Sequence, residues 1–109
     1  MEDEDAYRIV FTLTYRKEVM ATGMLVPDGF LVLKGSKLVN RLGVPKGIIE
    51  TRRNALRDRK ITIYRVFQED WRADSFKEAA SVILGSNNCG LDVWVAEDGR
   101  TMREVLGVE

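Results

Sequence analysis

Four basic side chains recur along one face of a predicted helix in the middle of the chain. They are separated by seven, four and three residues, and at about 100° per residue they share one ridge of the segment 46–60: Lys46, Arg53, Arg57 and Lys60. With no carboxylate among them, their repulsion costs roughly a few tenths of a kcal/mol per close pair. A phosphate backbone would turn this cost into attraction, with about one counterion released per contact. The alternative is a solvated face whose acidic partners lie elsewhere in the fold.

The charge of the whole chain hides this concentration of cations. Residues 34–65 contain ten basic and two acidic residues, whereas the net charge of the whole sequence is zero. An uneven charge distribution of this kind indicates an anionic partner or ion pairs between the blocks. Lys34 and Lys37 would extend the ridge, since both follow the predicted hairpin. Arg52 falls inside the apolar arc of the same helix, so we expect its head either to pass the edge of the core or to pair with a buried carboxylate.

A small polar loop, Gly85-Ser86-Asn87-Asn88-Cys89-Gly90, is the second candidate site. Asn87 and Asn88 each carry a donor and an acceptor, which suit the edge of a base. The loop follows a predicted helix C-terminus, whose dipole disfavours a phosphate. The alternative interpretation is a helix cap followed by an Asx-type turn, with Cys89 as a small packing residue.

The composition excludes several kinds of catalysis. The chain has no histidine and a single cysteine, so it cannot by itself build the common zinc sites or a nucleophile activated by a histidine base. We therefore expect no enzyme activity, no cofactor and no metal. A lone cysteine fits a reducing compartment, the acidic start Met1-Glu2-Asp3-Glu4-Asp5 is unlike a signal peptide, and no apolar run approaches the length of a membrane span. A cytoplasmic location is the expectation.

The elements that must position these residues follow from periodicity and turn residues. Alternating β-branched and aromatic residues predict strands over 7–15, 20–26, 30–34, 61–67 and 91–95. The turn Pro27-Asp28-Gly29, with a positive φ at the glycine, joins the second and third into a hairpin. Gly35, at the end of that hairpin, is expected to have a positive φ or a close backbone neighbour. Trp94 is expected in the core, and Trp71 half-exposed.

Three helices complete the predicted fold. The first begins near Pro45 and continues to about residue 59. The second begins after Ser75, which has the capping-box spacing to Glu78, and ends at Gly85; a short C-terminal helix follows Thr101. The sequence thus predicts an α+β fold: a small antiparallel sheet with a β-hairpin, two main helices and a short C-terminal helix. Residues 1–6 form an acidic tail and residues 7–109 a single accessory domain.

Several segments together resemble one family. They are Ala21-Thr22-Gly23, Asp28-Gly29-Phe30, Val32-Leu33-Lys34-Gly35-Ser36, the run 75–90, and Trp94 with Gly99-Arg100-Thr101-Met102. In order and spacing they resemble domain of unknown function 4357. That domain is found at the C-terminus of GIY-YIG nucleases and of restriction-modification proteins, and it looks like a relative of the RAMA domain of adenine methylases. The likeness covers about residues 20–106. Two departures are Asp74-Ser75-Phe76, where the family usually has Ser-Pro-Ser, and Cys89 before Gly90, where it often has Asn.

The resemblance implies an accessory role and transfers no catalytic residue. We expect a non-catalytic, nucleic-acid-associated module of a restriction-modification or nuclease system, with DNA or modified DNA as its partner. The alternative is a protein-interaction subunit that docks onto a nuclease or methylase without contacting DNA. The residues expected to bind nucleic acid are Lys34, Lys37, Lys46, Arg53, Arg57, Lys60, Asn87 and Asn88.

Overall fold

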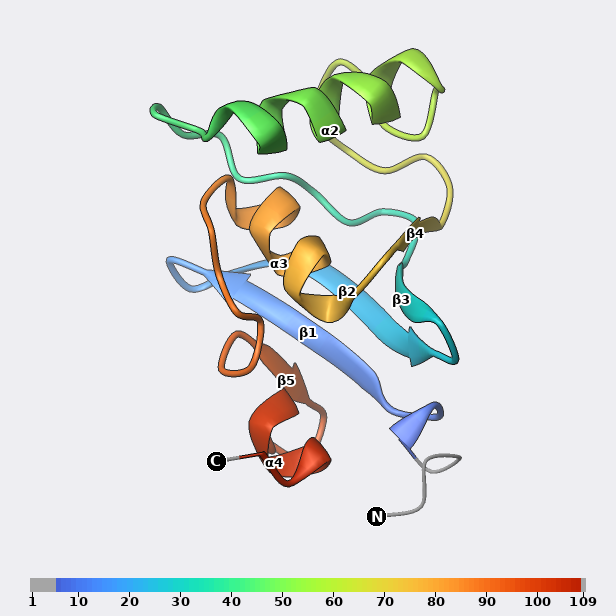
Figure 1. The fold of residues 1–109 in the computed structure, drawn as a ribbon, viewed down its shortest axis with the longest axis vertical. Coiled ribbons are helices and arrows are strands. Elements are labelled where there is room, and N and C mark those ends of the chain that lie inside the picture. The colour runs from blue at the N-terminus through green and yellow to red at the C-terminus, as the bar shows by residue number, and fades with distance from the viewer. Residues whose placement is uncertain (1–5, 109) are drawn as a thin grey trace.

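Five strands form one antiparallel sheet in the computed structural model of the chain, which describes residues 6–108 (Figure 1). Their order across the sheet is β4-β3-β2-β1-β5. The bounds are β1 Val10–Tyr15, β2 Glu18–Val26, β3 Gly29–Val32, β4 Trp71–Ala73 and β5 Trp94–Ala96. The first three strands form two consecutive hairpins, of which the sequence predicted the second, between β2 and β3; the two three-residue strands pair with the outer edges of this meander.

The three labelled helices also agree with the predicted α+β class. They are α2 Lys46–Arg57, α3 Phe76–Leu84 and the short α4 Met102–Leu106. The Ser75 hydroxyl accepts a hydrogen bond from the Glu78 amide at 3.0 Å, and Gly85 ends α3 in the left-handed conformation. Thr101 and Glu104 complete a capping box at the start of α4. These caps satisfy amides that a helix leaves free at its first turn.

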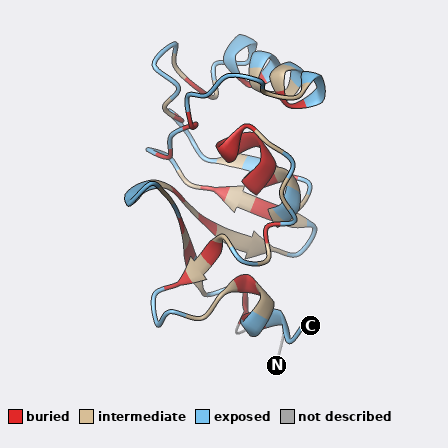
Figure 2. Ribbon diagram, turned by 90° about the vertical axis from the view of Figure 1, so that its left-hand side faces the viewer, coloured by how far each residue is buried: buried red, intermediate tan, exposed pale blue. Residues whose placement is uncertain are grey.

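The core lies between one face of the sheet and α3. Phe11, Phe30 and Trp94 point to this face and are fully buried, and the rings of Phe30 and Trp94 lie 4.6 Å apart. The Trp94 indole N–H donates to the Phe76 carbonyl at 3.0 Å, which satisfies a buried donor. Figure 2 shows the buried residues concentrated on α3 and the strands beneath it.

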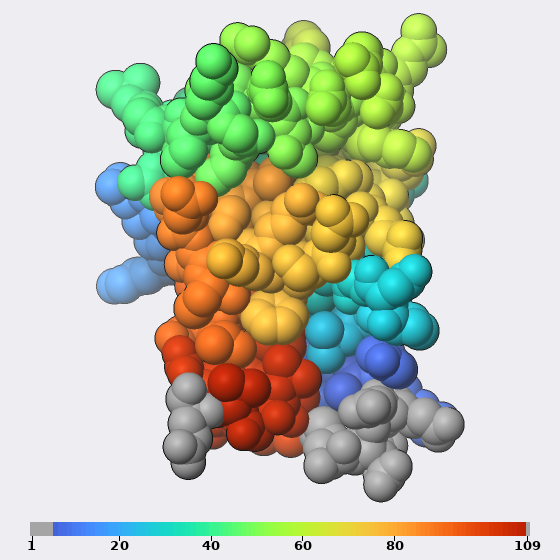
Figure 3. All heavy atoms as spheres, viewed as in Figure 1, coloured from blue at the N-terminus to red at the C-terminus, as the bar shows by residue number. Residues whose placement is uncertain are grey.

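The three labelled helices lie at different levels along the 38 Å long axis of the molecule. α3 contacts β2, β3 and β4, whereas α2 contacts α3. α2 therefore forms one end of the molecule, and α4 lies at the other end beside β5 (Figure 1). In the space-filling view the α2 end is covered by residues of the basic block 34–65, the segment with ten basic and two acidic residues (Figure 3).

The predicted strand over 61–67 is wrong. The chain makes only isolated bridges there, Ile61 with Phe67 and Val66 with Lys37. It reverses direction inside the segment: the Thr62 amide donates to the Val66 carbonyl at 2.9 Å, and the Thr62 hydroxyl accepts from the Tyr64 amide at 3.2 Å. The apparent alternation arose because residues on both sides of a turn enter the core.

Smaller corrections concern the ends of elements. Gly29 does not have a positive φ; a Cβ there would instead strike the Ala73 carbonyl oxygen on β4. Gly35 does have a positive φ, 93°. β4 was not predicted, because its three residues are too few to show a period. Of the expected acidic tail, residues 1–5 lie outside the described residues, and Ala6 is buried.

Candidate functional site

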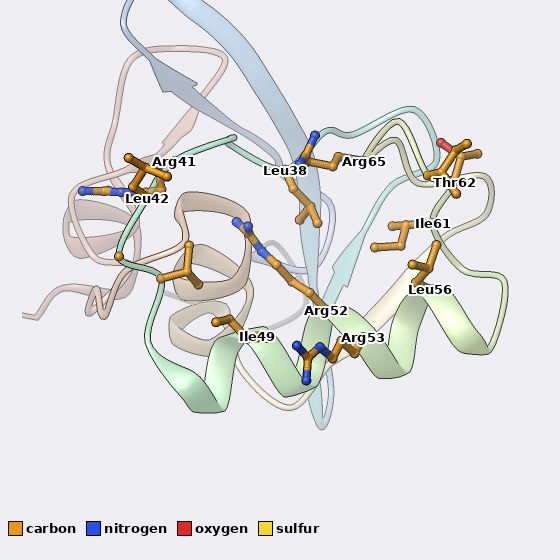
Figure 4. Close-up of a pocket in the computed structure, with 13 residues that line it drawn as sticks. Leu38, Arg41, Leu42, Ile49, Arg52, Arg53, Leu56, Ile61, Thr62 and Arg65 are labelled. Carbon is orange, nitrogen blue, oxygen red and sulfur yellow. The ribbon is translucent and has the colours of Figure 1, made fainter.

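A cavity of about 410 Å³ opens beside α2, between the segment that precedes this helix and the loop that follows it (Figure 4). Its apolar walls come from Leu38, Leu42, Val44, Ile49, Leu56, Ile61 and Ile63. Four arginines also line it, Arg52 and Arg53 of α2, Arg41 before it and Arg65 after it, together with Gly43 and Thr62. Among the described residues that line the cavity there is no carboxylate.

Arg52 connects α2 to the C-terminal end of α3. Its Nε and Nη2 both donate to the Val82 carbonyl, at 3.0 and 2.7 Å. Nη2 also reaches the carbonyls of Val39 at 3.2 Å and Ile83 at 3.3 Å. The last carbonyls of a helix lack partners within the helix, and a cation there is favoured by the helix dipole. The predicted alternative in which Arg52 pairs with a buried carboxylate is wrong, because its partners are backbone carbonyls at the edge of the core, where the residue is half-buried.

Gly85 makes this arrangement sterically feasible. It has a φ of 75°, and a Cβ at this position would lie 3.0 Å from Arg52 Nη2 and 3.1 Å from Arg41 Cδ. The glycine therefore ends α3 and also leaves room for two arginines of the cavity. Arg41 extends further to the following loop, where Nη1 donates to the Ser86 hydroxyl at 3.4 Å.

The arginines of the cavity have no carboxylate partner among the residues that the structure describes. The pKa of Arg52 is lowered, first by burial and then by repulsion from Arg65 and Arg41. A lowered arginine pKa means that the positive form is disfavoured by its surroundings. An anion bound in the cavity would relieve this repulsion.

Arg65 occupies an unusual backbone conformation for its residue type. Its φ is 64°, in the left-handed region, where a side chain with a Cβ costs about 1–2 kcal/mol. Its amide donates to the Thr62 carbonyl at 3.0 Å and its carbonyl accepts from the Leu38 amide at 2.9 Å. Glycine would satisfy the same turn with less strain, so the arginine side chain lies beside the cavity at a conformational cost.

Large apolar side chains accompany these cations at the surface. Leu42 is 96% exposed, and Ile63 and Tyr64 are 75% and 80% exposed. Leu42 and Ile63 line the cavity itself. Exposed apolar groups gathered beside unpaired cations mark a binding surface more strongly than either feature alone.

The predicted basic ridge is only partly present. Lys46, Arg53 and Arg57 lie on α2, but the helix ends at Arg57 and not near residue 59, so Lys60 leaves the ridge. Arg59 turns the chain with a φ of 63°, a role for which glycine is the usual signal. Lys60 pairs with Glu69, and Arg57 lies 3.5 Å from Asp58. Within the described residues Lys46 and Arg53 have no ion pair, and only Arg53 of the ridge lines the cavity.

The other predicted binding residues lie outside the cavity. Lys37 pairs with Glu18 at 3.2 Å. Lys34 is exposed, and its backbone amide donates to the Asp70 carboxylate at 2.8 Å. Asn88 accepts from the Gly90 amide at 2.7 Å, which is the Asx turn of the alternative interpretation. Asn87 is exposed.

Sequence reasoning missed Arg41 and Arg65 as members of the site. Both belong to the basic block 34–65, which was the available signal. They lie outside the helix whose periodicity was used, so only the fold brings them beside Arg53.

The remaining sequence predictions concern Cys89, the two tryptophans, metal binding and membrane spans. Cys89 is exposed, so its predicted packing role is wrong. Trp94 is buried and Trp71 half-buried, as predicted. Residues 6–108 contain no group of three His, Cys, Asp or Glu side chains suited to a metal ion, and none of their helices is both long and apolar enough to cross a bilayer.

Comparison with known proteins identifies the family. No curated protein and no solved structure matches the chain. One family model matches residues 11–106, which extends the resemblance seen in the sequence to include β1. This range contains the cavity, all of α4 and all five strands except Val10 at the start of β1. The chain therefore belongs to the family described as Domain of unknown function (DUF4357).

Proposed function

We propose that this chain is a non-catalytic nucleic-acid-binding module, with the cavity and the adjoining face of α2 as its contact surface. The observation that carries the proposal is the group of four arginines around one cavity without a carboxylate in the lining. Arginine is suited to phosphate because its planar group donates several hydrogen bonds in a fixed geometry. Lys46 and Arg53, free of ion pairs within residues 6–108, extend the positive surface along α2.

The biological setting in this proposal is a nuclease or restriction-modification system. It rests on the family resemblance, in which such domains accompany GIY-YIG nucleases and are related to the RAMA domain. A module that holds DNA or modified DNA near a separate catalytic domain needs no catalytic group of its own. The absence of histidine from the sequence is compatible with this division of labour.

The test is a titration of fluorescent single-stranded and duplex DNA at two salt concentrations. The decisive variant is Arg41→Ala with Arg53→Ala, which removes two unpaired cations from the cavity. A matched control, Arg100→Ala with Arg103→Ala, removes two cations that pair with Asp98 and Asp92 at the other end of the molecule.

The cavity variant should bind more weakly on every sequence, and its salt dependence should decrease by about two counterions. Affinity of the wild type should lie in the non-specific range of about 10⁻⁴–10⁻⁶ M at physiological salt. The control should bind nearly as the wild type does. An equal loss of DNA affinity in both variants would show that only the net charge of the protein matters. No loss of affinity in the cavity variant would refute the proposed surface.

A second candidate, docking onto a nuclease or methylase, is supported by the other face of the sheet. Val10, Met24 and Leu31 lie opposite one another across β1, β2 and β3, on the side away from α3. Met24 and Leu31 are half-buried and Val10 is exposed. Under this candidate, Met24→Asp should abolish association with a co-expressed nuclease or methylase and leave DNA binding unchanged.

A further inference from the structure

We propose that the cavity receives the base and the phosphate of one unpaired nucleotide, so that the domain favours single-stranded or locally opened nucleic acid over an intact duplex. This inference rests on the proposed function and specifies its substrate class. Two properties of the lining carry it: the cations and the apolar walls occur in the same space.

The apolar walls distinguish this site from a simple phosphate-binding surface. An intact duplex presents its phosphates outward and keeps the faces of its bases stacked inside, so cations alone would suffice to hold it. Leu42 and Ile63 would then remain exposed without a function, at 96% and 75% exposure. An unpaired base offers an apolar face as well as a charged backbone, and proteins bind such bases between apolar or aromatic side chains.

The arginines lie around the cavity, so a base bound among the apolar walls would have cationic donors near its edge and its phosphate. Arg41, Arg53 and Arg65 come from three separate segments around the cavity. Arg52 lies between them and is held by carbonyls through Nε and Nη2. Its Nη1 makes no hydrogen bond within residues 6–108 and remains a donor for a base edge or a phosphate oxygen.

The size of the cavity favours a nucleotide over a protein segment. Its volume of about 410 Å³ lies within the range of about 300–1,000 Å³ typical of small-molecule and cofactor sites. An acidic peptide with leucines would match the charge, but a bound helix or strand needs a longer groove with several anchor pockets in register. A nucleotide therefore fits the volume, and the lining of cations and apolar walls is the feature that favours it.

The experiment compares three fluorescent probes of equal length on the full chain: a thymine oligonucleotide, the same strand with abasic sites in its centre, and a duplex. The decisive variant is Leu42→Ser with Ile63→Ser, which removes apolar wall and keeps every cation. Its matched control is Val19→Ser with Leu106→Ser, two other exposed apolar residues outside the cavity. All four positions are surface-exposed, so folding is expected to survive and is checked by thermal unfolding.

We expect the wild type to bind the thymine strand about tenfold more tightly than the abasic strand or the duplex, the scale of one stacked base. The cavity variant should lose this preference and keep its duplex affinity, while the control keeps both. Equal binding of all three probes by the wild type would overturn the inference and leave the proposed function intact. Binding of none would remove both, and binding of a labelled acidic leucine-rich peptide by a chain that binds none of the three probes would assign the cavity to a protein partner.

Discussion

The two ends of the long axis use arginine in opposite ways. At the β5 and α4 end, Arg103 pairs with Asp92 at 2.9 Å and Arg100 with Asp98 at 2.7 Å. At the α2 end, Arg41, Arg53 and Arg65 have no acidic partner within the described residues, and Arg52 is held by backbone carbonyls. Arg100 and Arg103 are thus paired with neighbouring carboxylates. Within residues 6–108 the arginines around the cavity keep their charge unpaired, and this contrast is the basis for proposing a binding role at the α2 end.

The largest expected effect is on stability, at Arg52. Arg52→Lys keeps the charge but cannot donate to the Val82 carbonyl through two nitrogens. Hydrogen bonds from charged groups contribute about 1.5–3 kcal/mol, so the free energy of unfolding should fall by about that amount in chemical denaturation. The control is Arg53→Lys at the adjacent, exposed position, with an expected change below about 0.5 kcal/mol. Equal stability of the two variants would show that Arg52 does not tie α2 to α3.

The second prediction concerns Gly85, which lies beside Arg52 and Arg41. Gly85→Ala introduces a Cβ 3.0 Å from Arg52 Nη2 at a φ of 75°, and should lower the free energy of unfolding by about 1–3 kcal/mol. Gly99→Ala is the control, because Gly99 also has a positive φ but no neighbour within 4 Å. The excess loss at Gly85 measures the crowding, and nucleic-acid affinity should decrease in this variant alone. An identical loss in both would mean that backbone strain is the whole effect.

A third comparison separates stability from binding. Arg65→Gly and Arg59→Gly each remove one exposed arginine from the left-handed region, at φ values of 64° and 63°. Both should leave the melting temperature unchanged or raise stability by up to about 1 kcal/mol, since glycine relieves the strain. Only Arg65 lines the cavity, so only Arg65→Gly should weaken nucleic-acid binding severalfold. Similar binding losses in the two variants would argue for a diffuse charge effect.

The smallest expected effect is a change in the pH dependence of stability at the β5 and α4 end, where Arg103 pairs with Asp92. The hydrogen bond from Arg103 holds the pKa of Asp92 below its ordinary value of 3.8. Folding therefore favours the ionised carboxylate: its contribution to stability is present above pH 3.8 and is lost as the pH falls through the lowered pKa. Asp92→Asn should flatten the acid side of the stability curve slightly, with little change near neutrality because the pair is exposed. An unaltered acid profile would show that this pair does not contribute.

The sequence predicted the parts of the fold that depend on local patterns. Ser75 with Glu78 and Thr101 with Glu104 identified two helix starts, because a capping box needs only residues three apart. The hairpin 19–34 followed from alternation and the Pro27-Asp28-Gly29 turn. In 61–67 periodicity was misleading, because the turn formed by Thr62 and Arg65 contains none of the usual glycines and so gave no signal against a strand.

The candidate site lay beyond the reach of local patterns. From the sequence alone one could determine that residues 34–65 carry ten basic and two acidic groups, and that histidine chemistry is absent. The tertiary structure decided which of those cations remain available. Pairing of Lys37 with Glu18 and of Lys60 with Glu69 removes two, while packing of α2 on the end of α3 brings Arg41, Arg52 and Arg65 to one cavity. Charge is a property of each residue, but its neutralisation depends on neighbours that are distant in sequence and adjacent only after folding.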